Sequence, residues 1–196
     1  MKAFATRDDR SSTKFEGGKM DLTPLKRVRY SFGQVLGVDD FLGEQNYFRD
    51  KSRRHNRYLH GLGVVCGLEV EAGKDVLVIH PGLALNCEGE EVVVPQPVEM
   101  ALPGSRRSVY LSLHYAERET DPLPVAGTEE MAQNSRIEET YELTYQQENP
   151  CPGHRRKKSQ CLPCGKSHGI PLAKMVYRSG RWRIDRRFRR PQVLPR

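Results

Sequence analysis

The sequence predicts an α+β fold, with one N-terminal helix followed by a mainly antiparallel β-sandwich or small barrel of short strands, and with flexible terminal arms. Residues 41–60 lack proline and show helical periodicity, short apolar runs separated by glycine turns follow residue 61, and both chain ends are polar. A chain of 196 residues can enclose one core. Its hydrophobic fraction of 37% indicates that part of it lies outside that core.

Four segments follow from this pattern. Residues 1–26 are polar, contain Ser11, Ser12, Gly17 and Gly18, and are expected to form a flexible N-terminal arm. Residues 27–62 contain a short apolar segment and the helix. Residues 63–185 form the β-rich body, with a cysteine-rich insertion at 150–168. Residues 186–196 form a basic C-terminal tail.

The helix is expected to begin after Val38, because Asp39 or Asp40 can accept the free N–H groups of a first helical turn. Steps of four and three place six residues on one helical face: Phe41, Gln45, Phe48, Ser52, His55 and Leu59. This face mixes apolar and polar side chains, which favours packing on partner subunits or on a small sheet. Gly61 and Gly63 are expected to end the helix.

The body is expected to contain about seven to nine short strands. Turn residues separate the apolar runs at Gly73-Lys74, Pro81-Gly82, Glu88-Gly89 and Ser179-Gly180. Residues 108–117 alternate apolar and polar side chains, as a half-buried strand does. Residues 121–135 carry no such pattern and are expected to be a loop.

The cysteine-rich insertion has the spacing of a metal site. Cys161 and Cys164 form a C-x-x-C pair, and Cys151 lies ten residues earlier. With His154 or His168 they can complete a tetrahedral Cys3His site for a structural zinc ion, which would order a loop too polar to bury itself. A disulfide, or an insertion with incidental cysteines, is the alternative. No histidine ligand is followed by glutamate as in H-E-x-x-H, which argues against catalytic zinc.

The remaining ionisable residues form no catalytic constellation, so the chain is not expected to be an enzyme. His55 and His60 are five apart and should face different sides of an α-helix, which argues against one shared ion. Asn56 and Arg57 are expected to hydrogen-bond the strand backbone where the helix meets the sheet. Glu88, Glu90 and Glu91 lie at a predicted hairpin turn and are interpreted as a solvated face.

Charge is distributed unevenly along the chain. Residues 151–196 hold 14 basic residues and one acidic residue, whereas the rest of the chain holds 18 basic and 24 acidic residues. The basic tail is expected to be solvated, to dock on an acidic protein surface or to bind nucleic acid. The residues predicted to contact partner proteins are Phe41, Gln45, Phe48, His55, Asn56, Arg57, Arg186, Arg187, Arg189 and Arg190.

One long segment carries a family resemblance. The stretch "RVRYSFGQVLGVDDFLGEQNYFRDKSRRHNRYLHGLGVVCGLEV", Arg27 to Val70, resembles a segment of baseplate- and fibre-associated proteins encoded with phage-tail-like contractile injection systems. Weaker matches continue at Pro81–Leu85, Gly89–Val94, Ile170–Ala173 and Trp182–Asp185. The matching blocks are F-G-Q-x-L, D-D-F, E-Q-N-Y, R-R-H-N-R-Y-L-H-G and G-V-V-C-G-L.

The resemblance implies a structural adaptor, baseplate or fibre-attachment component that acts through protein–protein contacts. Its partners would be baseplate, spike, sheath or fibre subunits in a multi-copy assembly. It would be made in the cytoplasm and incorporated into a particle. The resemblance supplies no catalytic residues. A zinc-stabilised, basic nucleic-acid-binding protein is the alternative that the cysteine cluster and the tail leave open.

Overall fold

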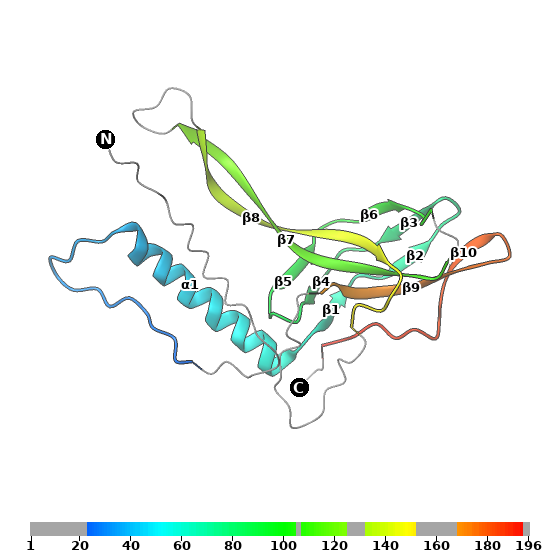
Figure 1. Cartoon of the computed structure of the whole chain (residues 1–196), viewed down its shortest axis with the longest axis horizontal. Helices are drawn as coiled ribbons and strands as arrows, with labels where there is room; N and C mark the ends of the chain where they lie inside the picture. Colours follow the sequence, from blue (N-terminus) through cyan, green and yellow to red (C-terminus); the bar gives the residue numbers. More distant parts are fainter. Residues whose placement is uncertain (1–22, 105–106, 125–131, 152–167, 194–196) are drawn as a thin grey trace.

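The computed structural model describes residues 23–104, 107–124, 132–151 and 168–193. Figure 1 shows a β-rich body with two extensions: a helical arm formed by α1 and the segment before it, and a long two-stranded ribbon formed by β7 and β8. The predicted α+β architecture, with one helix ahead of antiparallel sheets, is confirmed. In the described part of the chain, no helix is both long and apolar enough to cross a membrane.

The helical region comprises α1 (Val38–His55) and a π-helical turn, η1 (Asn56–His60). Ten strands follow within the described residues: β1 (Gly63–Gly67), β2 (Val70–Ala72), β3 (Val76–Ile79), β4 (Gly82–Leu85), β5 (Glu91–Val94), β6 (Val98–Ala101), β7 (Val109–Pro124), β8 (Ala132–Gln146), β9 (Ile170–Arg178) and β10 (Arg181–Ile184).

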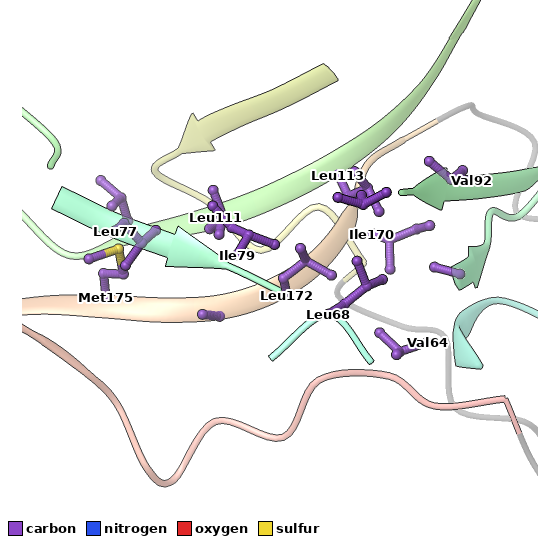
Figure 2. Close-up of a cluster of buried hydrophobic side chains, with 14 of the residues drawn as sticks. Val64, Leu68, Leu77, Ile79, Val92, Leu111, Leu113, Ile170, Leu172 and Met175 are labelled. Carbon is purple, nitrogen blue, oxygen red and sulfur yellow. The ribbon is translucent and has the colours of Figure 1, made fainter. Parts of the chain in front are cut away.

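The strands form three antiparallel sheets, in the orders β1-β4-β5, β10-β9-β7-β8 and β2-β3-β6. One apolar core joins them, because inward-facing side chains of all three sheets meet there. Figure 2 shows Leu77 of β3, Leu111 of β7 and Met175 of β9 in this core, and all three are fully buried. Burial of such side chains is the main source of stability in a small body of this kind.

Most of the hairpin turns lie where the glycine-containing turn residues of the sequence predicted them. The β9–β10 connection has Ser179 and Gly180 in positive-φ conformations (52° and 80°), as a two-residue hairpin turn requires. Gly73 lies in the turn between β2 and β3, and its N–H donates to the carbonyl oxygen of Val76 at 2.8 Å. These turns were predictable because each depends on a few neighbouring residues.

The β7–β8 ribbon differs from the sequence-based expectation. Its backbone pairing runs from Tyr110 opposite Gln146 to Pro124 opposite Ala132. The prediction of a loop across residues 121–135 is therefore wrong for both described ends of that range. The ribbon lacks apolar alternation there because neither face is buried: Leu123 and Ile137 are 54% and 60% exposed.

The basic C-terminal segment packs on the body as far as Val193. Gln192 forms a parallel bridge with Val64 of β1, and Phe188 contacts the ring of Tyr110 edge-on. The guanidinium of Arg190 donates to the carbonyl oxygen of Leu68. Residues 186–193 thus follow the surface of the body instead of extending from it as a free tail.

Candidate functional site

The predicted partner-binding residues lie on three features, and the helical arm is the first of them. Helix α1 begins at Val38, one residue earlier than expected, with Gly37 as its N-cap. Asp40, in the first turn, accepts a hydrogen bond from the backbone N–H of Gly37 at 2.9 Å. Acidic residues in the first turn and basic residues in the last turn suit the helix dipole. The helix nevertheless has no buried residue, and so it is not a core helix.

An extended segment, residues 23–37, runs alongside α1 in the opposite direction (Figure 1). Arg54 donates to the carbonyl oxygen of Thr23 at 2.7 Å near one end, and the hydroxyl of Tyr30 donates to the carboxylate of Glu44 near the other. This hydrogen bond to Glu44 raises the pKa of Tyr30. The extended segment and α1 together form the helical arm, residues 23–55.

The arm carries an unusually apolar surface. Phe41 and Phe48, both predicted to contact partners, are 52% and 62% exposed, and Gln45 between them is also exposed. The exposed large apolar side chains of the arm are Tyr30, Phe32, Val35, Leu36, Val38, Phe41, Leu42 and Phe48. We call these eight residues the apolar arm surface. Eight of the large apolar side chains that are exposed in the described part of the chain are thus on the arm, and large exposed apolar patches mark interaction sites in folded proteins.

The second feature is the junction between the arm and the body, where the R-R-H-N-R motif contacts the β4–β5 turn. Arg53 forms an ion pair with Glu90 at 2.6 Å. The amide of Asn56 donates to the carbonyl oxygen of Gly89 at 3.0 Å and lies 3.3 Å from Glu91. Arg57 donates to the carbonyl oxygen of Glu88 at 3.2 Å. Asn56 and Arg57 thus hydrogen-bond the backbone where the helix meets the body, but the carbonyl groups belong to the β4–β5 turn and not, as expected, to a strand.

The β4–β5 turn is organised to receive these side chains. The buried Asn86 accepts hydrogen bonds from the N–H groups of Glu88 and Glu90, and its amide donates to the carboxylate of Glu90 at 2.6 Å. Interpreting Glu90 as part of a solvated face is therefore wrong, because only 11% of its side chain is exposed. Sequence reasoning missed it because its burial depends on a helix 37 residues away.

Gly89 allows the closest approach in the junction. A Cβ atom placed on Gly89 would lie 2.1 Å from the carbonyl oxygen of Arg53, and the backbone φ is +86°. Only glycine meets both conditions without strain. The sequence shows Gly89 between Glu88 and Glu90 in a predicted turn, but it does not show that Arg53 of the helix lies against this glycine.

The end of the helix contradicts one further expectation. The last turn is π-helical, and the N–H of Gly61 donates to the carbonyl oxygen of Asn56, five residues earlier, at 2.9 Å. This wider turn brings residues five apart to the same side. The Nε2 atoms of His55 and His60 therefore lie 3.3 Å apart, although α-helical spacing placed them on different sides. Gly61, at φ 74°, ends the helical region as expected.

The predicted zinc ligands are only partly within the described residues. Cys151 and His168, at the two ends of the insertion, are brought together: the sulfur of Cys151 lies 3.1 Å from Nδ1 of His168. His154, Cys161 and Cys164 lie outside the described residues. Within the described ranges, no three histidine, cysteine or acidic side chains are grouped closely enough to hold a metal ion.

The tail arginines have different surroundings. Arg190 is held within the chain, because it donates to the carbonyl oxygen of Leu68 and lies 3.1 Å from the carboxylate of Glu69. Arg189 donates to the carbonyl oxygen of Arg186 at 3.3 Å. The N–H of Arg187 donates to the carboxylate of Asp185 at 3.0 Å. Among the four, Arg190 is thus the one whose charge is matched by an acidic side chain of the body.

Comparison with known proteins gives a likeness of fold. No family model and no curated protein matches the sequence. A chain of the type VI secretion system TssK-TssF-TssG baseplate subcomplex, solved by cryo-electron microscopy, superposes with a TM-score of 0.51 at 15% identity, covering 86% of this chain and 62% of that one. The present chain therefore spans less than two thirds of that protein.

Two further solved structures superpose with lower TM-scores. The crystal structure of TssK gives a TM-score of 0.47 at 12% identity, covering 83% of this chain and 41% of that chain. A chain of the baseplate complex from the type VI secretion system gives 0.48 at 15% identity, covering 86% and 60%. The likeness at 0.51 is one of fold: this chain is similar to part of a chain of the type VI secretion system baseplate subcomplex, which agrees with the resemblance that the Arg27–Val70 motif predicted.

Proposed function

We propose that this chain is a structural adaptor of a phage-tail-like contractile injection particle, located at the baseplate or where fibres attach. The single observation that carries the proposal is the apolar arm surface, which lies on the helical arm, whose helix has no buried residue. The fold likeness to a baseplate chain supports the kind of assembly in which such a surface would be covered.

The energetics of the arm support a partner. An isolated helix of this length is marginally stable in water, and most helices in proteins are stabilised by packing an apolar face. Along the arm, α1 packs mainly on residues 23–37, and Phe41 and Phe48 remain more than half exposed. Full burial of an exposed Phe side chain contributes about 1.5–3 kcal/mol, so covering what remains exposed of each ring would contribute roughly half of that. Another protein chain is the natural cover.

The junction supports an adaptor in particular. An adaptor has to transmit position from one partner to another, which requires that its arm be fixed on its body. The Arg53–Glu90 ion pair and the Asn56 hydrogen bonds join the two at a turn that is itself organised by Asn86. The arm therefore presents its surface in a defined direction.

The proposal is tested by particle assembly. The chain is co-expressed with the sheath, tube and baseplate genes of its own cluster, particles are isolated by density gradient, and the chain is quantified in them by mass spectrometry. Phe48→Asp is expected to lower its incorporation strongly, and Val93→Asp is the matched control, because Val93 is 53% exposed on β5 of the body. Equal incorporation of both variants, or a chain that never joins particles, would refute the proposal.

We propose in addition that the insertion binds a structural zinc ion through Cys151, Cys161, Cys164 and His168. The short distance between Cys151 and His168 favours His168 over His154 as the imidazole ligand. Cysteine thiolate and histidine nitrogen are the ligands that structural zinc prefers. The ion would close the base of the insertion against β9.

A further inference from the structure

The π-helical turn η1 places two histidines side by side on the surface of the elbow between the arm and β1. The Nε2 atoms of His55 and His60 are 3.3 Å apart, and the two rings are tilted by 53° with centroids 5.2 Å apart. His55 is exposed and His60 is partly exposed, so both nitrogens are accessible from solvent.

This spacing matches that of two nitrogen ligands on one metal ion. Zinc binds histidine nitrogen at about 2.0–2.1 Å, so two imidazole nitrogens on a tetrahedral ion are separated by about 3.3 Å. The imidazole side chain suits zinc, nickel and copper ions. The separation of the two nitrogen atoms that chelation requires is therefore already present in the chain.

The backbone accounts for the geometry. On a regular α-helix, side chains three or four residues apart are neighbours and a pair five apart diverges. Here the i→i+5 hydrogen bond from Gly61 to Asn56 widens the turn and realigns the pair. The turn is held in place by the body, because Asn56 and Arg57 are hydrogen-bonded to the β4–β5 turn. π-helical turns of this kind frequently occur at functional sites.

We propose that His55 and His60 form a two-histidine site for a divalent transition-metal ion of the zinc, nickel and copper group. The other coordination positions are held by water in the isolated chain. The site is separate from the cysteine-rich insertion, and the proposal does not rest on the proposed function in a particle.

Calorimetric titration of the untagged, full-length chain with Ni²⁺ tests the proposal. Cys151, Cys161 and Cys164 are changed to serine in all samples, so that thiols do not compete. His55→Ala and His60→Ala are each expected to lower the Ni²⁺ affinity by about tenfold or more, since even an outer-shell partner of a metal ligand contributes about 10–100-fold. His80→Ala, a histidine on the loop after β3, serves as the control. Equal affinity in all four chains overturns the proposal.

A second measurement keeps the test independent of the serine background. In the unmodified chain, the imidazole proton resonances of His55 and His60 are followed by NMR during a Zn²⁺ titration. The proposal expects both to shift together in one binding step, with circular dichroism unchanged between wild type and the alanine variants. Resonances that stay in place, or that shift at different zinc concentrations, overturn it.

Discussion

The guanidinium of Arg53, in the last turn of α1, lies 2.6 Å from the carboxylate of Glu90 in the β4–β5 turn. Their side chains are 29% and 11% exposed, so this ion pair is shielded from water on the body side. It connects the helical arm to a turn whose shape Asn86 already fixes. The direction in which the arm leaves the body depends on this contact.

Arg53→Ala is expected to loosen the arm. Hydrogen bonds to charged groups contribute about 1.5–3 kcal/mol to stability. Losing this one is expected to lower the free energy of local unfolding of residues 53–62. Hydrogen exchange of these amides, followed by mass spectrometry, measures it. The matched control is Arg118→Ala, which breaks an ion pair of the same length, 2.6 Å, with Glu138 on the exposed ribbon. That pair is exposed to solvent and screened, so it is expected to contribute little to stability.

The two ion pairs have the same length but differ in exposure to solvent, so the two variants test whether burial strengthens the Arg53–Glu90 pair. If each variant increases hydrogen exchange in its own segment by the same factor, burial at the junction contributes nothing. If Arg53→Ala leaves residues 53–62 as protected as in wild type, the ion pair does not fix the arm.

Gly89→Ala is expected to destabilise the fold more than Gly180→Ala does. Both glycines have positive φ, +86° and +80°, so each substitution costs about 1–2 kcal/mol from the backbone alone. At Gly89 the new methyl group would also meet the Arg53 carbonyl oxygen at 2.1 Å, whereas nothing lies within 4 Å at Gly180. Overpacking of that kind adds about 1–3 kcal/mol.

Urea unfolding of the two glycine variants gives the comparison directly. If Gly180→Ala lowers the free energy of unfolding more than Gly89→Ala does, then the arm does not contact the β4–β5 turn as closely as described.

Metal analysis tests the zinc proposal. Plasma mass spectrometry of the purified chain is expected to find one zinc per chain, lost in Cys161→Ser and in His168→Ala and kept in His154→Ala. The reason is that Cys151 and His168 already lie 3.1 Å apart. Full free-thiol counts together with no zinc in wild type would show that the insertion has no zinc site. Zinc lost in His154→Ala but kept in His168→Ala would show that His154 is the imidazole ligand.

Stability at high pH is expected to depend on Tyr145. Burial raises the pKa of Tyr145 to about 12, from an ordinary value of 10.0, and its hydroxyl donates to the carbonyl oxygen of Ala101 at 2.9 Å. Between these two values the unfolded chain releases a proton that the folded chain keeps. The folded state is therefore favoured fully below pH 10 and loses this contribution as the pH rises toward 12.

The measurement is urea unfolding of wild type and Tyr145→Phe between pH 8 and pH 11. The variant is expected to be less stable near pH 8, because the hydrogen bond is lost, and to show a smaller further decrease above pH 10. An identical decrease in both chains would contradict a raised pKa at this residue.

Much of the body could be predicted from the sequence because its turns are local. Gly180 and Gly89 mark tight connections, and the alternation around Leu111 and Leu113 marks a buried strand. The helix was predictable for the same reason, through its periodicity and the acidic first turn. Asn56 and Arg57 could be assigned to the junction because polar residues at the end of such a helix need hydrogen-bond partners.

The rest could not be predicted, for physical reasons that differ from place to place. Glu90 is shielded only by a helix distant in the sequence. His55 and His60 are adjacent only because the last turn is π-helical, which no periodic pattern announces. Within the range expected to be a loop, the described ends of the β7–β8 ribbon show no buried apolar face, so the exposed Leu123 leaves no alternation to detect. Arg190 was expected in a free tail, and its contact with Glu69 depends on the body surface.

The central claim is that the apolar arm surface is covered by another subunit, and site-specific photocrosslinking in assembled particles tests it most directly. A photoreactive amino acid is placed at Phe41 or Phe48 on the arm, and at Val93 on the body for comparison. Both arm positions are expected to crosslink to a different particle protein at much higher yield than position 93 does. Particles in which the arm positions crosslink to nothing, while the chain is present, would contradict it.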